Sequence, residues 1–329
     1  MTEEPKVNLS LPDEGESPHI PPGVWPTMIT PFTGCGDIDW PALDDQVEWY
    51  IDAGVAGLFA VCLSSEMYEL SPTERVRLAE GVVERAAGRV PVVAAGAFGD
   101  TADEQADAVR RVHETGVEAV VLTVNQLAGE AESDDVWQRQ ADAMFGACEE
   151  IPLGLYECPR PYHRTLSAEI LGWAARTGRI FFYKDTCCDL EEIRAKLTAI
   201  EGTSLSWFNA HAPTLLESLR AGGRGYSSIA ANFIPETYVW LCHHFADDPD
   251  LAEEVQAFLT EAQKAITVKY PAGAKHYLRR VGLDIEAHCR VDCPELNEDE
   301  VEALEALRRE GAGWMEKLGG PERQTRRKD

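Results

Sequence analysis

Short apolar runs alternate with amphipathic stretches along most of the chain, from Gly23 to about residue 245. The eight runs are each five to seven residues long and cover residues 24–30, 57–62, 90–96, 119–124, 152–157, 180–184, 205–209 and 225–230. Apolar runs of this length are typical of parallel strands that are buried on both faces. The pattern therefore predicts eight buried strands.

The stretches between the runs have the apolar spacing that is expected of surface helices, as at residues 40–54, 71–88 and 101–116. The second of these begins with Ser71 and Glu74 at the spacing of a capping box. Glycines that fit helix C-caps are Gly54, Gly88, Gly116 and Gly222.

Eight strands that each precede a helix predict a (β/α)8 TIM barrel over residues 23–248. A doubly wound sheet is the alternative. It is disfavoured because the turn after the first strand has only Gly34 and Gly36, and lacks the third glycine and the immediate helix start of a dinucleotide-binding turn.

The sequence after the barrel predicts a helical extension of the same domain over residues 249–318. Its amphipathic patterns cover residues 250–266, 272–282 and 297–318. The acidic, proline-rich residues 1–22 predict a flexible N-terminal arm, and residues 319–329 a frayed tail.

Composition and charge restrict the location and the partners of the protein. The N-terminus has neither a basic nor an apolar signal segment, and no run of about 18 apolar residues is present, so a cytoplasmic location is expected. The formal net charge of −27 argues against nucleic acid and anionic membranes as partners. The nine cysteines are expected to be reduced thiols without metal-ligand spacing, so we predict no metal and no cofactor.

In a barrel of this kind, the chemistry lies at the carboxyl ends of the strands. Lys184 is the only lysine at the predicted strand ends, and it directly follows the apolar residues 180–183. A partly desolvated amine has a lowered pKa and can attack a carbonyl carbon to form a Schiff base. The alternative is a structural lysine that pairs with Asp185, Glu157 or Asp189.

Two further strand ends support the nucleophile hypothesis. Tyr156 ends the preceding strand, so we expect it at the level of Lys184, where a phenol can move protons during imine chemistry. Residues 62–66, with the sequence CLSSE, offer the hydroxyls of Ser64 and Ser65 and backbone N–H groups to a carboxylate. The alternatives are a core-capping tyrosine and an ordinary polar loop.

With these residues, the chain resembles the dihydrodipicolinate synthase/N-acetylneuraminate lyase family of Schiff-base-forming (β/α)8 enzymes over about residues 23–310. CLSSE stands where the family carries a GTTGE or GSTGE loop, and YECP (156–159) where it has Y-N-x-P. YKDTCCDL (183–190) matches its K-E-A-T-G-D stretch, and GGRGYSSIAANFIPE (222–236) its glycine-rich eighth strand.

The resemblance implies a lyase or class I aldolase that makes or cleaves a carbon–carbon bond. Lys184 would form the imine with a 2-oxo acid, typically pyruvate, and Tyr156 would be the acid and base. Ser64 and Ser65 would hold the carboxylate of the oxo acid, and the backbone near Ser227 would help to close the site. The resemblance also implies an aldehyde as the second substrate and a homotetramer built from dimers.

The chain departs from the family in the half of the site that selects the second substrate. Leu63 stands where the family has a hydroxyl beside the tyrosine, and Leu127 and Ala128 replace a tyrosine pair. These departures favour an aldolase for another 2-oxo acid over dihydrodipicolinate synthase itself, which stays the alternative.

Two more departures concern the loop after the fifth strand. Pro161 replaces an arginine that binds the carboxylate of the aldehyde, so Arg160 and Arg164 are candidate substitutes. Glu157 replaces an asparagine, and we expect it to pair with an arginine such as Arg160; the alternative is that it faces the substrate pocket as a second carboxylate.

Two hypotheses of other classes remain. A metal-dependent barrel hydrolase or aldolase would need a cluster of His, Asp and Glu at the strand ends, where His211 has no clear partner. A non-catalytic oxo-acid-binding barrel would keep Lys184 without turnover, and Leu63 and Ala128 are compatible with it.

Overall fold

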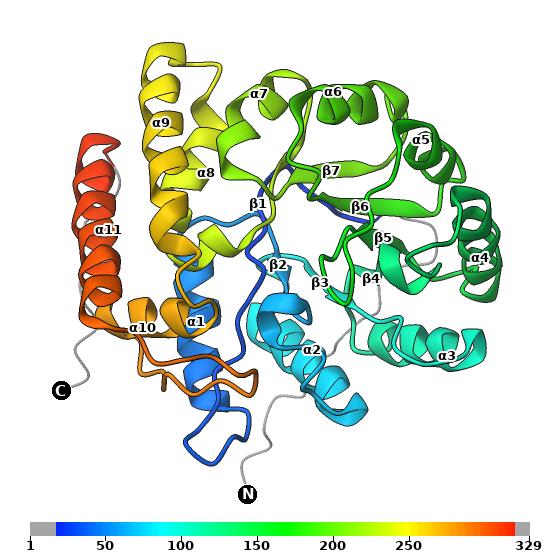
Figure 1. Cartoon of the computed structure of the whole chain (residues 1–329), viewed down its shortest axis with the longest axis horizontal. Coiled ribbons are helices and arrows are strands. Elements are labelled where there is room, and N and C mark those ends of the chain that lie inside the picture. Colours follow the sequence, from blue (N-terminus) through cyan, green and yellow to red (C-terminus); the bar gives the residue numbers. More distant parts are fainter. Residues whose placement is uncertain (1–17, 320–329) are drawn as a thin grey trace, which may run out of the picture.

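The computed structural model describes residues 18–319 and has an eight-stranded sheet at its centre (Figure 1). The strands are β1 (Gly23–Val24), β2 (Leu58–Phe59), β3 (Val92–Ala95), β4 (Ala119–Thr123), β5 (Leu153–Tyr156), β6 (Ile180–Asp185), β7 (Ser206–Asn209) and β8 (Gly225–Tyr226). Their order is β1-β8-β7-β6-β5-β4-β3-β2, and every pairing is parallel. A parallel bridge between Thr27 and Phe59 closes the ring. The predicted TIM barrel is therefore confirmed.

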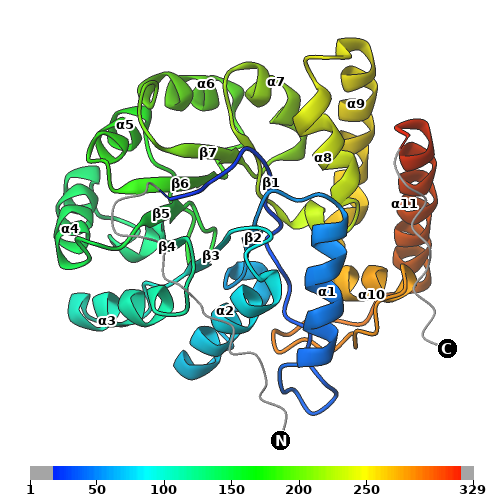
Figure 2. The same cartoon turned by 180° about the vertical axis from the view of Figure 1, so that it is seen from behind.

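Helices surround the strands on the outside of the barrel, as both views show (Figures 1 and 2). The helices of the barrel are α1 (Trp40–Asp52), α2 (Pro72–Ala86), α3 (Ala102–His113), α4 (Asp134–Ala147), α5 (Ala168–Arg176), α6 (Leu190–Ala199), α7 (Leu215–Arg220) and α8 (Pro235–His244). Three helices follow them: α9 (Pro249–Ile266), α10 (Ala272–Arg280) and α11 (Glu298–Lys317). α9 and α11 pack against α8, and α10 packs against α11.

The ends of the helices agree with the sequence signals. Ser71 caps α2, because its Oγ accepts a hydrogen bond from the Glu74 N–H at 3.3 Å while the Glu74 carboxylate accepts one from the Ser71 N–H at 2.8 Å. The four glycines predicted at C-caps all have positive φ angles: Gly54, Gly88, Gly116 and Gly222.

Several strands are shorter than the apolar runs that predicted them. The first run was predicted over residues 24–30, but β1 ends at Val24. Pro26 has no N–H to donate to a ladder, and beyond it the pairing is sparse: the Thr27 N–H donates to the Ser228 carbonyl at 3.5 Å and the Met28 N–H to the Phe59 carbonyl at 3.0 Å. The apolar run marks burial, whereas the strand ends where regular pairing ends.

Aromatic side chains fill the interior of the barrel. Trp25, Phe59, Phe182 and Phe208 are fully buried, with centroid distances of 4.9 to 5.7 Å between neighbouring rings. Phe182 lies two residues before Lys184 on the same face of β6, so these rings form an apolar floor beneath the carboxyl ends of the strands.

The described end of the N-terminal segment belongs to the barrel. The flexible arm was predicted over residues 1–22, of which residues 1–17 lie outside the described part of the chain. Ile20 is buried, its carbonyl accepts a hydrogen bond from Ser206 Oγ at 3.2 Å, and the Pro21 carbonyl accepts one from Trp25 Nε1 at 3.1 Å. Residues 18–22 are therefore packed and do not form part of a flexible arm. Of the predicted tail, residues 320–329 also lie outside the described part.

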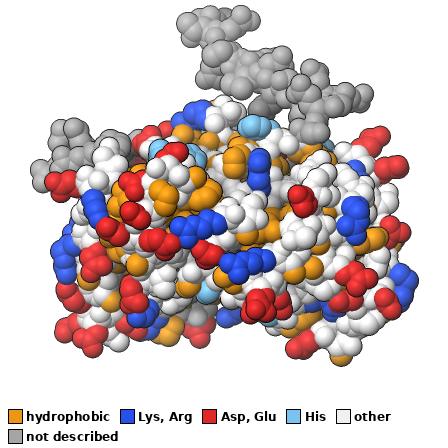
Figure 3. Space-filling view, turned by 90° about the horizontal axis from the view of Figure 1, so that it is seen from above, with side chains coloured by type: hydrophobic (Ala, Val, Ile, Leu, Met, Phe, Trp, Pro, Cys, Tyr) orange, Lys and Arg blue, Asp and Glu red, His pale blue; other side chains and the backbone are white. Residues whose placement is uncertain are grey.

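Acidic side chains are spread over the face of the molecule seen in Figure 3, with Lys and Arg between them. Within residues 18–319, none of the helices combines the length and the apolar character that a membrane span requires. All nine cysteines are free thiols.

Candidate active site

Lys184 lies near the carboxyl end of β6 and points into the barrel. Its neighbours along the strand, Tyr183 and Asp185, point the other way, toward α6, because successive side chains of a strand alternate. In the register of the sheet Lys184 is the partner of Tyr156 on β5, and its Nζ lies 4.0 Å from the centroid of the Tyr156 ring. The structure thus brings together the two residues that the sequence placed at one level.

The environment of Lys184 favours the neutral amine. The side chain is almost fully buried, with 4% of its surface exposed, and burial lowers the pKa of its amine to about 8. About a tenth of the amine is therefore neutral at pH 7, compared with less than about a thousandth for an ordinary lysine.

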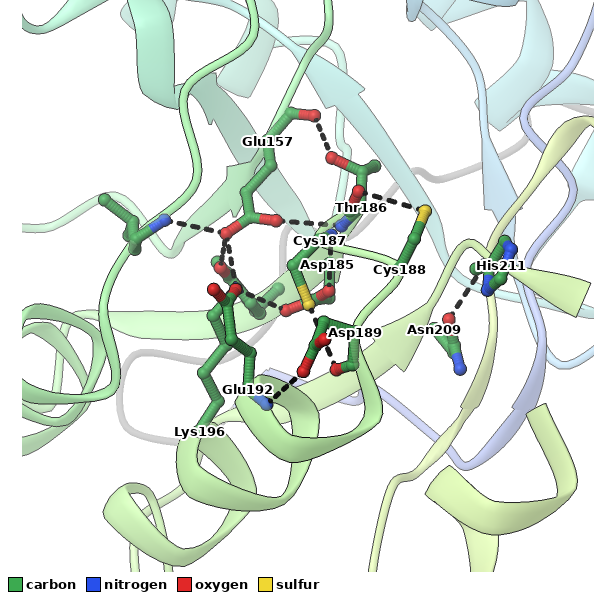
Figure 4. Close-up of polar contacts among 12 residues, drawn as sticks. Glu157, Asp185, Thr186, Cys187, Cys188, Asp189, Glu192, Lys196, Asn209 and His211 are labelled. Carbon is green, nitrogen blue, oxygen red and sulfur yellow. Dashed lines mark hydrogen bonds and ion pairs between the residues drawn. The ribbon is translucent and has the colours of Figure 1, made fainter. Parts of the chain in front are cut away.

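The predicted alternative of a salt-bridged Lys184 disagrees with the structure. Within residues 18–319, Lys184 takes part in none of the ion pairs. The three carboxylates proposed as its partners have other partners (Figure 4): Glu157 and Asp185 bind Lys196, and Asp189 accepts hydrogen bonds from the first N–H groups of α6.

Glu157, Asp185 and Lys196 form a buried ionic cluster between the barrel and α6 (Figure 4). Lys196 Nζ lies 2.8 Å from Glu157 Oε1 and 2.7 Å from Asp185 Oδ2, and at most 1% of each of these three side chains is exposed. Glu157 also accepts hydrogen bonds from the Tyr183 hydroxyl and from the Thr186 N–H. Burial and the neighbouring Asp185 raise the pKa of Glu157, and Lys196 opposes them. The cluster joins the residues that directly follow Tyr156 and Lys184.

The expected pairing of Glu157 with Arg160 is wrong. Glu157 follows the inward-pointing Tyr156, so it points outward beneath α6, while Arg160 lies on the exposed loop beyond β5. Lys196 was not among the predicted site residues. Its signal was its position between Ile193 and Leu197 on the apolar face of α6, where an unpaired lysine would be costly.

Ser64 and Ser65 lie in a short 3₁₀ helix, η1 (Leu63–Ser65), and have different environments. The Ser65 hydroxyl donates to the Met28 carbonyl at 2.7 Å and accepts from the Cys62 N–H at 3.2 Å, while its own N–H donates to the Cys62 carbonyl at 3.0 Å. The polar groups of Ser65 are thus used to fix the loop. Ser64 Oγ donates to Thr27 Oγ1 at 3.1 Å, which leaves its lone pairs as acceptors.

A second buried ion pair fixes the same loop to the C-terminal extension. Glu66 has a positive φ of 58°, and its Oε1 lies 2.7 Å from Nζ of Lys275 on α10. Its Oε2 accepts hydrogen bonds from the N–H groups of Arg290 and Val291, at 2.5 and 2.8 Å. Lys275 on α10 and the loop between α10 and α11 therefore support residues 62–66.

Ser227 directly follows β8 and is completely buried. Its N–H donates to the Asn209 carbonyl at 2.8 Å, but its Oγ has no hydrogen-bond partner within the described residues. Tyr226 stacks on Tyr238 of α8, outside the barrel, so alternation directs Ser227 to the interior. A buried hydroxyl of this kind is available to a ligand.

The two candidate arginines lie beyond β5. Arg160 is exposed, and its carbonyl accepts hydrogen bonds from the Tyr68 hydroxyl at 3.0 Å and from Asn125 Nδ2 at 2.7 Å. Arg164 is paired with Asp134 at 2.8 Å. Of the two, Arg160 is the candidate that is free of an ion pair within residues 18–319.

Cys158 and Tyr68 lie near Tyr156 and were not among the predicted site residues. The Cys158 N–H donates to the Tyr156 carbonyl at 2.8 Å, so the chain turns directly after β5, and Cys158 is fully buried. Burial raises the pKa of the Tyr156 phenol, and the nearby Cys158 and Tyr68 raise it further. Tyr68 comes from the segment after η1, so sequence spacing gave no sign that it lies near Tyr156.

The strand ends show no arrangement of the kind that holds a metal ion. Within residues 18–319, no group of three or more His, Cys, Asp and Glu side chains is placed to bind one. His211 contacts Thr214 Oγ1 at 3.2 Å, and burial lowers the pKa of its ring. The metal-dependent hypothesis has no donor set in the described part of the chain.

Comparison with known proteins identifies relatives of this chain. The model of the Dihydrodipicolinate synthetase family matches residues 21–310. The 4-hydroxy-tetrahydrodipicolinate synthase of Ruegeria pomeroyi is 31% identical over 280 residues, which cover 79% of this chain and 89% of that protein. The enzyme of the same name from Shewanella frigidimarina is 26% identical over 273 residues, which cover 82% and 91%.

A solved structure agrees in fold. YagE, a prophage protein of Escherichia coli K12 belonging to the dihydrodipicolinic acid synthase family and solved in complex with pyruvate, superimposes with a TM-score of 0.77 at 22% identity, covering 91% of this chain and 98% of YagE. The match of the family model over most of the chain shows that this protein belongs to the Dihydrodipicolinate synthetase family.

Proposed function

We propose that this protein is a lyase or class I aldolase that forms a Schiff base between Lys184 and a 2-oxo acid of the pyruvate type. The observation that carries the proposal is the state of Lys184. It is a buried amine with a pKa of about 8, outside any ion pair of the described chain and 4.0 Å from the Tyr156 ring. The complex of YagE with pyruvate supports the choice of oxo acid.

In the proposed reaction, the neutral amine of Lys184 attacks the carbonyl carbon of the oxo acid, the nitrogen gives up a proton, and the carbonyl oxygen takes one to give a carbinolamine. A second proton then goes to the carbinolamine hydroxyl, which leaves as water and gives the protonated imine. Loss of a proton from the adjacent carbon gives an enamine, whose carbon attacks or releases an aldehyde. Each step moves one proton near the imine nitrogen.

Tyr156 is the proposed donor and acceptor of these protons. Burial raises the pKa of its phenol well above the usual range, so the resting side chain is protonated at neutral pH and acts first as an acid. The unpartnered hydroxyl of Ser227 would donate to the carboxylate of the oxo acid, and the Ser64 hydroxyl would do so by turning its proton from Thr27 Oγ1 to the carboxylate, with Ser65 fixing the loop.

Arg160 is the proposed contact for an acidic second substrate, because Arg164 is already paired with Asp134. Leu63, Leu127 and Ala128 replace the family's polar groups in the half of the site that selects this substrate. We therefore favour an aldehyde other than that used by dihydrodipicolinate synthase. The homotetramer stays a prediction.

The experiment is reductive trapping. Incubation with pyruvate and borohydride should add the mass of one reduced pyruvyl group, mapped to the peptide that contains Lys184. Lys184→Arg should abolish the adduct, while Lys264→Arg, at a surface lysine with 77% of its side chain exposed, should keep it. Failure of the folded wild type to form the adduct would refute the pyruvate assignment.

A non-catalytic oxo-acid-binding barrel is the second candidate, because Leu63 brings no proton-exchanging group to the site. It predicts trapping at Lys184 without exchange of the methyl protons of pyruvate and without turnover of any added aldehyde. Proton NMR of pyruvate in deuterated water separates the two functions.

A further inference from the structure

Asn232 is a fully buried amide beside the proposed carboxylate site. It ends the short 3₁₀ helix η4 (Ile229–Asn232), which begins two residues after Ser227. Burial of an amide is costly unless its polar atoms are paired, so its hydrogen bonds show which segments it holds in place. The role inferred for Asn232 rests on the proposed function, in which Ser64 and Ser227 bind the carboxylate of the oxo acid.

The amide nitrogen of Asn232 joins two segments that are far apart in the sequence. Nδ2 donates to the carbonyl of Ile229 at 2.9 Å, within η4, and to the carbonyl of Thr27 at 2.9 Å, on the segment after β1. Asn232 and Thr27 are 205 residues apart in the chain. The hydrogens of one side chain therefore tie the segment that follows Ser227 to the segment after β1.

Thr27 extends this connection to Ser64. Thr27 is buried, and its Oγ1 accepts a hydrogen bond from Ser64 Oγ at 3.1 Å. Its N–H also donates, at 3.5 Å, to the carbonyl of Ser228, the residue next to Ser227. The side chain of Thr27 thus contacts Ser64, while its backbone is held from the side of β8.

The orientation of the Asn232 amide is fixed from its other end. Oδ1 accepts a hydrogen bond from the Tyr50 hydroxyl, which itself accepts one from Gln46 Nε2 at 3.1 Å. Tyr50 and Gln46 are fully buried and belong to α1. The Tyr270 hydroxyl lies 3.0 Å from Nδ2. Since Nδ2 faces two carbonyls and Oδ1 faces the proton of a phenol, the amide has one orientation that satisfies its partners.

We propose that Asn232 is a positioning residue that holds Ser64 and Ser227 together around one carboxylate. It does not touch the oxo acid itself. When Ser64 turns its proton to the carboxylate, Thr27 can donate its own hydroxyl proton to Ser64 Oγ in return, so Thr27 must keep its place while the substrate is bound. Loss of the Asn232 amide leaves the Thr27 carbonyl without this donor and lets the two sides of the site separate. The oxo acid then binds more weakly.

The test separates binding of the oxo acid from imine formation in the full-length protein. The initial rate of adduct formation with pyruvate and cyanoborohydride is measured over a range of pyruvate concentrations. Asn232→Ala should raise the half-maximal pyruvate concentration about tenfold or more, because the two hydroxyls no longer converge on one carboxylate. The maximal rate should stay within about threefold of the wild type, with its pH midpoint at about 8, because Lys184 on β6 keeps its burial.

Two further variants exclude loss of packing as the cause. The matched control is Asn125→Ala. Asn125 is also a buried amide, and its Nδ2 donates to three carbonyls of the loop after β5 at 2.7 to 2.8 Å. This control should leave the half-maximal concentration within about threefold, because its partners lie outside the segments of Ser64 and Ser227. Asn232→Asp keeps the shape and the acceptor for Tyr50 but offers at most one hydrogen to two carbonyls, so it should raise that concentration by about threefold or more.

Trapping in the wild type distinguishes the failure of this role from the failure of the proposed function. If the wild type forms the adduct and either folded variant of Asn232 saturates within about twofold of the wild-type pyruvate concentration, the positioning role is refuted while the proposed function stands. A rise of the same size in Asn125→Ala would also refute the role, because loss of any buried amide would then weaken binding. Absence of the adduct in the wild type would refute the proposed function and the positioning role with it.

Discussion

The ionic cluster of Glu157, Asp185 and Lys196 gives the sharpest prediction about stability. Lys196→Met keeps the length of the side chain but removes the ammonium that lies 2.8 and 2.7 Å from the two carboxylates. Removing one partner of a buried ion pair costs about 3–5 kcal/mol, because a buried charge is left uncompensated. Here two carboxylates lose their common partner.

The loss of folding free energy corresponds to a lower midpoint temperature of thermal unfolding. At about 2.1 cal/mol/K per residue over roughly 300 ordered residues, each kcal/mol moves the midpoint by about 1.6 °C, so the expected decrease is about 5–8 °C at pH 7.5. The assay is calorimetric or CD-monitored unfolding. The control is Lys264→Met, which breaks an exposed pair with Glu261 and should shift the midpoint by less than about 1 °C.

The loss of stability caused by Lys196→Met should also depend on pH. In the wild type, burial and Asp185 already raise the pKa of Glu157. Without Lys196 to oppose them, the folded variant holds a proton on this carboxyl to higher pH than the unfolded chain does. Stability of the variant relative to the wild type therefore falls as the pH rises above the unfolded pKa of about 4.3. A loss no larger than that of Lys264→Met, or one that is greatest at low pH, would refute the reasoning.

Two further predictions concern the rate of imine formation. Lys184 attacks as the neutral amine, so the initial rate of pyruvate trapping should rise with pH and level off above its pKa of about 8; a rate that keeps rising to pH 10 would show that the amine is not desolvated. Tyr156→Phe should slow trapping about 10²- to 10⁴-fold in rapid-quench measurements while the final adduct on Lys184 is retained, and an unchanged rate would remove Tyr156 from the mechanism.

The barrel could be predicted from the sequence because both of its signals are local. Apolar runs of strand length and helices with their own caps, such as the one that begins at Ser71, need no long-range contact to be recognised. The placement of Lys184 beside Tyr156 followed from the same logic, since parallel strands of a barrel end at one level.

The partners of these residues could not be predicted in the same way. Glu157 and Lys196 are 39 residues apart. Whether they meet depends on the face of the sheet to which Glu157 points and on the rotation of α6 about its axis. The Tyr68 contact with the loop after β5 spans 92 residues and depends on how the segment after η1 turns. Sequence spacing also could not separate Ser65, whose hydroxyl supports the backbone, from its neighbour Ser64.

The most direct test of the central claim is a crystal structure of the protein soaked with pyruvate. The account predicts continuous density from Lys184 Nζ to the second carbon of pyruvate, with the carboxylate against Ser64 and Ser227 and the Tyr156 hydroxyl beside the new bond. Pyruvate bound elsewhere, or an unmodified Lys184 paired with a carboxylate, would contradict it.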